Sequence, residues 1–294
     1  MTMKKILLAT AASLALSGAA FAEGHSGVKL GIIYGFTGPI ESLTPAMAAG
    51  AEHAMAEVTA SGKFLGGKAV SSVRADGTCI DSAAATAAAE RLITADKVSG
   101  IVGSDCSGVT TAILTNVALA NGMVMISPSA TSPALSTVED NGLFFRTAPS
   151  DARQGAVMTD VINDRGIKEV ALTYTNNDYG KGLADAFQTA FEAAGGKVTI
   201  SAAHEDGKAD YSAEVGALAA AGGEALVVVG YVDQGGKGII EGSLDSGAFE
   251  TFVLPDGMIG DSLMEALGAD MNGSFGQLPG TDSPGAAKLV EMMK

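Results

Sequence analysis

The feature that most constrains the fold of this sequence is a regular alternation between short apolar runs and longer segments with helical periodicity. Short runs rich in Val, Ile and Leu are typical of strands buried on both faces, and chains that alternate them with helices form parallel sheets covered by helices. The sequence therefore predicts an α/β fold. In the first series we expect strands at residues 28–33, 69–75, 101–102 and 123–126, and helices at residues 82–94 and 109–121. The stripe of Met47, Ala51, Met55 and Val58 is interpreted as the core-facing side of a further helix.

The alternation is interrupted once and then resumes, which predicts two lobes. We interpret residues 143–151 as an extended crossing segment that ends in a Ser or Asp able to cap a helix. In the second series we expect strands at residues 169–174, 198–203, 226–229 and 252–254, and helices at residues 182–194, 212–221 and 238–246. Residues 273–277 are expected to cross back, and residues 284–293 to form a helix. The prediction is of two doubly wound parallel-sheet lobes with a ligand cleft between them, lobe I comprising residues 23–147 and 277–294, and lobe II comprising residues 148–276.

Residues 1–22 have the pattern of a secretory signal peptide. Lys4 and Lys5 precede an apolar run at residues 6–16, and the sequence Ala-Phe-Ala at residues 20–22 is a small-x-small cleavage site. The alternative, a membrane anchor, is disfavoured because the run is too short to span a bilayer. Losing Lys4 and Lys5 on cleavage leaves 16 of the 18 basic residues against 33 acidic ones. A surface this acidic repels nucleic acid and anionic lipid, so neither is expected as a partner.

Two loops that follow expected strands are rich in hydroxyls and small residues. They lie at residues 103–108 and 126–133, and the first opens a helix whose free N–H groups suit an anion. Ligands of open α/β sheets bind at the carboxyl ends of the strands. We therefore interpret the two loops as a cradle for a carboxylate. The alternative is that these Ser and Thr side chains only cap helices, which is their commoner role.

Five short motifs follow one another along the chain. They are Cys-Ser at residues 106–107, Ile-Ser-Pro-Ser-Ala-Thr-Ser-Pro at 126–133, Asn-Asp-Tyr-Gly-Lys-Gly at 177–182, Val-Gly-Tyr at 229–231 and Leu-Pro-Asp-Gly at 254–257. In their order and intervals they resemble the periplasmic leucine/isoleucine/valine-binding protein family of ABC importers, over nearly all of the chain after the signal peptide. The resemblance implies the type I periplasmic binding protein fold, a location in the periplasm, an amino-acid ligand, and a permease of the inner membrane as partner. We expect a monomer.

The resemblance also implies a set of site residues. Ser107 and Thr131 would hold the ligand's carboxylate with hydroxyl and backbone N–H groups. Ser129, through its carbonyl, and Asp256, through its carboxylate, would hold the ammonium. The implied ligand-binding residues are Ser107, Ser129, Ala130, Thr131, Tyr179, Tyr231 and Asp256, with the two tyrosines as pocket walls.

Asp256 is also a candidate on chemical grounds alone. A carboxylate at the end of a buried strand is costly unless a cation compensates its charge. The alternative is an exposed loop Asp that caps the region of Asp261. Most relatives have Glu at the matching position, and Asp is one methylene shorter. Leu43 matches a position that is often aromatic in the family, so this wall leaves room for a different ligand side chain.

The sequence contains two cysteines, Cys79 and Cys106. An even pair in an exported protein favours a disulfide, whereas two free thiols would be the cytosolic default. Both cysteines follow expected strands that we take to be adjacent, which is close enough for a bridge. The resembling family carries a disulfide at matching places. No metal site is expected, since neither cysteine has a His or a second pair at ligand spacing.

Catalysis and cofactor binding have little support in the sequence. His25, His53 and His204 are separate from one another, no G-x-S-x-G motif is present, and the glycines of residues 31–38 do not follow the G-x-G-x-x-G spacing. We therefore expect no cofactor and no enzymatic activity. Two alternatives stay open, the same fold binding an amide, urea or an aromatic acid, and a secreted α/β hydrolase. Because family members usually continue with further strands, we expect a C-terminal truncation that leaves an open edge on the lobe I sheet.

Overall fold

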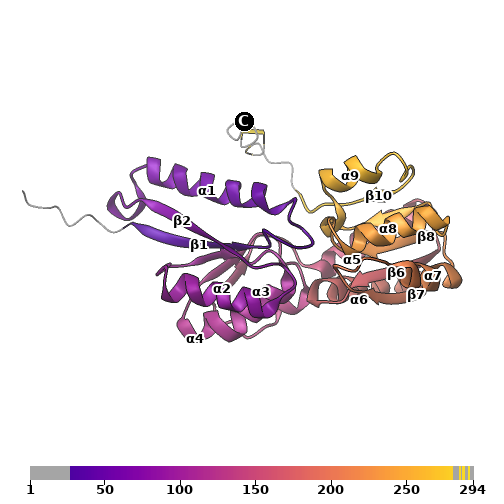
Figure 1. The fold of residues 1–294 in the computed structure, drawn as a ribbon, viewed down its shortest axis with the longest axis horizontal. Helices are drawn as coiled ribbons and strands as arrows, with labels where there is room; N and C mark the ends of the chain where they lie inside the picture. Colours follow the sequence, from indigo (N-terminus) through magenta and orange to yellow (C-terminus); the bar gives the residue numbers. More distant parts are fainter. Residues whose placement is uncertain (1–26, 281–284, 286, 289–290, 292–294) are drawn as a thin grey trace, which may run out of the picture.

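The protein was analysed as a computed structural model, which describes residues 27–280, 285, 287–288 and 291. Two lobes lie side by side along the long axis, the first indigo to magenta and the second orange (Figure 1). Each lobe contains a five-stranded sheet, and every strand pair in both sheets is parallel. The expected two-sheet α/β architecture is therefore confirmed. The expected signal peptide lies outside the described residues.

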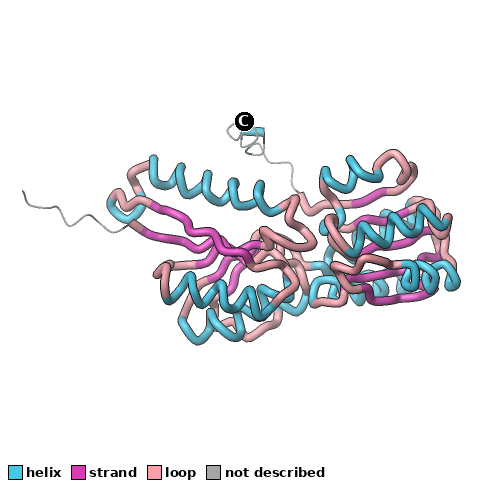
Figure 2. Tube along the Cα trace, viewed as in Figure 1, coloured by secondary structure: helices cyan, strands magenta, loops and turns pink. Residues whose placement is uncertain are grey.

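The first sheet has the strand order β2-β1-β3-β4-β5. Its strands are β1 (Val28–Tyr34), β2 (Val70–Asp76), β3 (Ile101–Gly103), β4 (Met125–Ser127) and β5 (Phe144–Arg146). Its helices are α1 (Thr44–Ala60), α2 (Ser82–Thr94), α3 (Ser107–Ile113) and α4 (Leu119–Asn121), with a π-helical stretch at Leu114–Ala118 between the last two. Helix α1 covers one face, and α2, α3 and α4 cover the other (Figures 1 and 2).

Successive strand residues divide between the two faces of this sheet. Ile33 belongs to the core formed with α2 and α3, and Ile32 packs with Met55 under α1. Met55 is buried as expected, but Val58 is 39% exposed, so the expected stripe on α1 was wrong at this end. Ile126 is also exposed on the α1 face, because α1 extends over β1 and β2 rather than β4.

The second sheet has the strand order β10-β9-β8-β6-β7. Its strands are β6 (Glu169–Thr175), β7 (Lys197–His204), β8 (Ala225–Val229), β9 (Phe252–Leu254) and β10 (Phe275–Gly276). Its helices are α5 (Asp151–Asp164), α6 (Asp178–Ala193), α7 (Ser212–Ala221), α8 (Gly235–Ser246) and α9 (Asp261–Leu267). Helix α5 packs against α6, and α7 packs against α8. Within the described part of the chain, no helix is both long and apolar enough to cross a membrane.

Three expectations about local structure need correction. The extended segment at residues 143–151 contains a strand, β5, because Phe144 has a place in the core when it pairs with Met125. Residues 273–277 add β10 to the edge of the second sheet rather than only crossing back. Helix α6 begins at Asp178, four residues earlier than expected, since the Asn177 side chain caps it by accepting a hydrogen bond from the Gly180 N–H (3.0 Å).

Among the contacts that join the two lobes in the described part of the chain, one is made by hydrogen bonds and one by the close approach of a glycine. At the first, the Ser42 N–H donates to Asp233 Oδ2 (2.9 Å), and the Asp233 N–H donates to the carbonyl of Pro39 (3.0 Å). At the second, Gly182 of α6 meets the loop after β4, where an added Cβ would lie 2.9 Å from Pro133 Cδ. Glycine is therefore required for this approach. These contacts place the ends of the two sheets opposite each other.

Candidate ligand-binding site

The site begins where β3 and β4 end. The two strands are neighbours in register, with Ile101 opposite Met125, so the loops that follow them leave the sheet side by side. This confirms the expected meeting of the two hydroxyl-rich segments. Helix α3 starts at Ser107 within the first of these loops, and the second runs from Ser127 into a short 3-10 helix at Pro133–Ser136.

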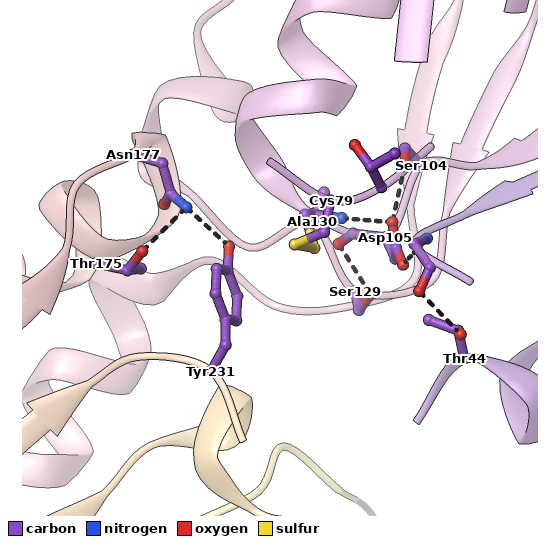
Figure 3. The surroundings of a disulfide bond; sticks show 12 residues. Thr44, Cys79, Ser104, Asp105, Ser129, Ala130, Thr175, Asn177 and Tyr231 are labelled. Carbon is purple, nitrogen blue, oxygen red and sulfur yellow. Dashed lines mark hydrogen bonds between the residues drawn. A yellow bond between two sulfur atoms is a disulfide. The ribbon is translucent and has the colours of Figure 1, made fainter. Parts of the chain in front are cut away.

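Asp105 holds the first loop in place. Its carboxylate accepts hydrogen bonds from the backbone N–H groups of Gly35 (2.7 Å) and Cys106 (3.0 Å) and from the Ser104 hydroxyl (2.9 Å), and the residue is buried. Burial raises the pKa of Asp105, and these hydrogen bonds oppose the rise. Figure 3 shows the carboxylate at the centre of this network. Asp105 is a positioning residue that we did not single out in the sequence, where it looked like one polar residue of a hydroxyl-rich loop.

Cys79 and Cys106 form the expected disulfide, with their Cα atoms 5.2 Å apart. The reason given for it was partly wrong. Cys79 follows β2 and Cys106 follows β3, and these strands are separated by β1 in the sheet. The bridge forms because the loop after β2 passes over the end of β1, where Cys79 lies against Gly35.

Ser107 lies in the first loop and Thr131 in the second, and a hydrogen bond joins the two loops at this point. The Ser107 hydroxyl accepts a hydrogen bond from the Ser132 N–H (3.1 Å), which leaves its own hydrogen free to donate. The Thr131 hydroxyl is buried and makes no well-formed hydrogen bond to a described residue, although it lies near enough to the Asp151 carboxylate to lower the pKa of Asp151. A buried hydroxyl without a partner is costly, so this one is available to a ligand.

Ser129 and Ala130 are already engaged within the protein. The Ser129 hydroxyl donates to the carbonyl of Asp105 (3.0 Å), as Figure 3 shows. The Ala130 N–H donates to the Ser127 hydroxyl (2.9 Å), and its carbonyl accepts from Arg146 Nη1 (3.1 Å). The Ser129 carbonyl is the group expected to bind the ligand's ammonium. The ligand-binding roles of Ser129 and Ala130 stay predictions.

Asp256 follows β9 and sits in a 3-10 turn (Asp256–Met258) of the second lobe. Its Oδ1 accepts hydrogen bonds from the Tyr179 hydroxyl (2.9 Å) and from Gln154 Nε2 (3.1 Å). Burial raises the pKa of Asp256, and the hydrogen bonds lower it. The alternative role as a cap is not met, because α9 begins after Gly260 with no side-chain cap. Gln154 is a further positioning residue that the sequence analysis missed.

Tyr179 and Tyr231 stack on each other with ring centroids 5.4 Å apart. Burial, reinforced by the charge of Asp256, raises the pKa of Tyr179 well above its usual value, so its hydroxyl stays protonated and donates. The Tyr231 hydroxyl accepts a hydrogen bond from Asn177 Nδ2 (3.2 Å; Figure 3). Both rings belong to the large apolar core that spans the two lobes, which includes both cysteines and against which Leu43 packs. The expected pocket walls are thus brought together, although their contact with a ligand stays a prediction.

Asp151 is the most unusual group near this site. It is fully buried as the first residue of α5, and neither carboxylate oxygen has a well-formed hydrogen bond to any described residue. Burial, together with the charge of Asp256, raises the pKa of Asp151 to about 8, and the Thr131 hydroxyl and the Arg146 guanidinium oppose that rise. The sequence indicated only a capping Ser or Asp here. Ser150 takes the capping role (3.3 Å to the Ala152 N–H), which leaves Asp151 unpaired.

Two large surface grooves do not include the side chains of Thr131, Asp151 or Asp256. One of about 1110 Å³ runs between α7 and α8, and another of about 970 Å³ follows α6 beside Asn177. Because neither groove is lined by Asp151 or Asp256, the candidate site is identified from the chemistry of its side chains. Among the residues with described positions, no group of His, Cys, Asp and Glu is arranged to hold a metal ion. The arrangement is instead suited to a small zwitterion, with hydroxyls from one lobe and carboxylates opposite them.

Comparison with known proteins gives consistent matches. Residues 27–294 match the family described as "Periplasmic binding protein". The Leu/Ile/Val-binding protein homolog 3 of Brucella melitensis is 29% identical over 98% of this chain and 76% of its own. A Leu/Ile/Val-binding protein of Citrobacter freundii is 30% identical over 93% of this chain and 72% of its own. Among solved structures, a leucine-binding protein of Thermotoga maritima superposes with a TM-score of 0.78 at 26% identity, covering 90% of this chain and 75% of that one.

Proposed function

This chain belongs to the periplasmic binding protein family, in the group that contains the Leu/Ile/Val-binding proteins, and we propose that it captures a branched-chain or other aliphatic amino acid for an ABC importer. It acts in the periplasm as a monomer, after removal of residues 1–22, and delivers its ligand to a permease in the inner membrane. It makes and breaks no covalent bond. Lobe I comprises residues 23–147 and 277–294, and lobe II comprises residues 148–276.

One observation carries this proposal, the opposition of hydroxyl groups on one lobe to the Asp256 carboxylate on the other. The hydroxyl of Thr131 and the donor of Ser107 lie at the strand ends of the first sheet, where they suit a carboxylate. The carboxylate of Asp256 lies at the strand ends of the second sheet, where burial makes a cation favourable. An α-amino acid presents both charges a short distance apart, and the Ser129 carbonyl adds an acceptor for the ammonium.

The part of the apolar core beside these polar groups supports an aliphatic side chain. It contains the stacked rings of Tyr179 and Tyr231 and the disulfide, and Leu43 packs against it. None of them offers a buried charge to a polar ligand side chain. Because a ligand held at both ends bridges the lobes, binding would draw the lobes together.

Calorimetry with leucine, isoleucine and valine, against acetamide, urea and benzoate, tests the proposal. Asp256→Ala should weaken amino-acid binding by roughly 2–5 kcal/mol, because it removes the ammonium's charge partner. Thr131→Ala should cost about 1–3 kcal/mol through the carboxylate's lost hydrogen bonds. The matched control is Asp261→Ala, an exposed carboxylate five positions on, which should bind as the wild type does.

Small-angle scattering adds a conformational readout. Leucine should compact the wild type and Thr131→Ala, but not Asp256→Ala, because lobe II of that variant no longer binds the ligand's ammonium. Unchanged leucine affinity in Asp256→Ala would rule out the ammonium assignment and favour an amide or an aromatic acid. Mass spectrometry of protein secreted to the periplasm should give an N-terminus at Glu23, and an intact residue 1 would contradict cleavage.

A further inference from the structure

The fully buried carboxylate of Asp151 and the half-buried carboxylate of Asp256 approach each other from different elements. Asp151 enters from the start of α5, and Asp256 enters from the turn after β9. Gln154, one turn along α5 from Asp151, donates to Asp256 Oδ1 (3.1 Å), which ties the two elements together. The charge of Asp256 acts directly on Asp151. Two ionised carboxylates placed so closely in a buried site repel each other strongly.

The groups around Asp151 do not neutralise it. Within the described part of the chain, Arg146 of β5 is the cation whose charge acts on Asp151, but Arg146 Nη1 donates to the carbonyls of Ala130 (3.1 Å) and Ser132 (2.9 Å). From the loop after β4, Thr131 offers a hydroxyl without a charge. Tyr179 of α6 also lies near the pair, and its hydroxyl donates a hydrogen bond to Asp256. The pair therefore carries more negative charge than its neighbours balance.

We propose that Asp151 and Asp256 share one proton in the ligand-free protein and release it to the solvent when a ligand's ammonium group binds beside them. The proton resides on Asp151, whose oxygens lack partners, while Asp256 keeps its charge through two hydrogen bonds. The incoming ammonium supplies the positive charge that both carboxylates need, and Asp151 then ionises. This inference rests on the proposed function, because it takes an ammonium-bearing ligand as the trigger.

The direction of the pH dependence follows from this exchange. Burial and Asp256 raise the pKa of Asp151 to about 8 in the ligand-free protein, and a bound ammonium lowers it. The free protein therefore binds more protons than the complex at neutral pH. Affinity should rise with pH by up to about tenfold per unit between pH 6 and pH 7.5, and level off above pH 8.

Two measurements on the wild type, Asp151→Asn and Asp160→Asn test the proposal. Asp160 is an exposed carboxylate on the same helix, so its variant is the matched control. The first measurement follows carbon-13-labelled aspartate carboxyls by NMR in ligand-free protein. One resonance should titrate near pH 8 in the wild type and in Asp160→Asn, and should be missing from Asp151→Asn. If every aspartate of the ligand-free protein titrated with an ordinary pKa, this measurement alone would overturn the proposal.

The second measurement is calorimetry with leucine at pH 7 in buffers of different ionisation enthalpy. Close to one proton should be released per leucine bound by the wild type and by Asp160→Asn, and almost none by Asp151→Asn. Leucine binding without proton release would overturn this inference and leave the proposed function standing. No leucine binding, with Asp151 still titrating near pH 8, would support the shared proton and contradict the proposed function instead.

Discussion

Removing the Cys79–Cys106 disulfide should destabilise the protein while leaving its ligand affinity almost intact. The bridge joins residues 27 positions apart. For a loop of this length, the chain-entropy relation gives about 12 cal/mol/K, which is about 3.5 kcal/mol at 25 °C. Replacing both cysteines with Ala suits the test, because both are buried and Ser would introduce hydroxyls without partners. In urea unfolding followed by circular dichroism, this loss of unfolding free energy should appear in the first transition.

The affinity for leucine should change by less than about threefold, because three hydrogen bonds to Asp105 hold the loop before Ser107 independently of the bridge. Reducing the wild type with dithiothreitol should reproduce the variant's unfolding curve, and the variant itself should not respond to the reductant. A loss of stability below 1 kcal/mol in the variant would refute the argument from loop closure. A large loss of affinity with little loss of stability would show that the bridge shapes the site directly.

Three further substitutions probe closure, the carboxylate and a buried imidazole. Gly182→Ala would place a Cβ only 2.9 Å from Pro133 Cδ, which is too close. The variant should therefore bind leucine about tenfold more weakly, and its ligand-bound form should be larger than the wild type's in small-angle scattering. Compaction equal to the wild type's would argue against a role for this contact. Tyr179→Phe should reduce leucine affinity roughly fivefold in calorimetry, since Asp256 loses one hydrogen bond (2.9 Å), and an affinity equal to the wild type's would contradict that role. Burial lowers the pKa of His204 to about 4, below its ordinary value of about 6.5, so the unfolded state binds more protons and stability falls as pH drops through that interval. Between pH 7 and pH 4.5 the wild type should lose about 2 kcal/mol more than His204→Gln in urea unfolding, and parallel losses would show that the imidazole is not buried neutral.

Local patterns in the sequence were enough to predict most elements and the class of fold. Helices α2 and α7 and strand β9 have the expected bounds. For α2 the start is encoded locally, because the Asp81 side chain accepts hydrogen bonds from the N–H groups of Ala83 and Ala84. Both hydroxyl-rich loops also lie at neighbouring strand ends, as the parallel alternation required. The strand β5 was missed, since a short segment such as residues 144–146 becomes a strand only when a neighbour is available to pair with it.

The order of strands and the burial of charges were decided by tertiary structure. The sequence placed both cysteines at strand ends, but whether β1 lies between β2 and β3 depends on pairing between distant segments. Asp151 looked like a helix cap, and Asp105 looked like a loop residue. Each became a buried carboxylate because other parts of the chain cover it. The sequence by itself determined most of the elements and the places of the two hydroxyl-rich loops. The approach of Asp151 to Asp256 arises instead from packing between segments about a hundred residues apart, which local sequence patterns do not encode.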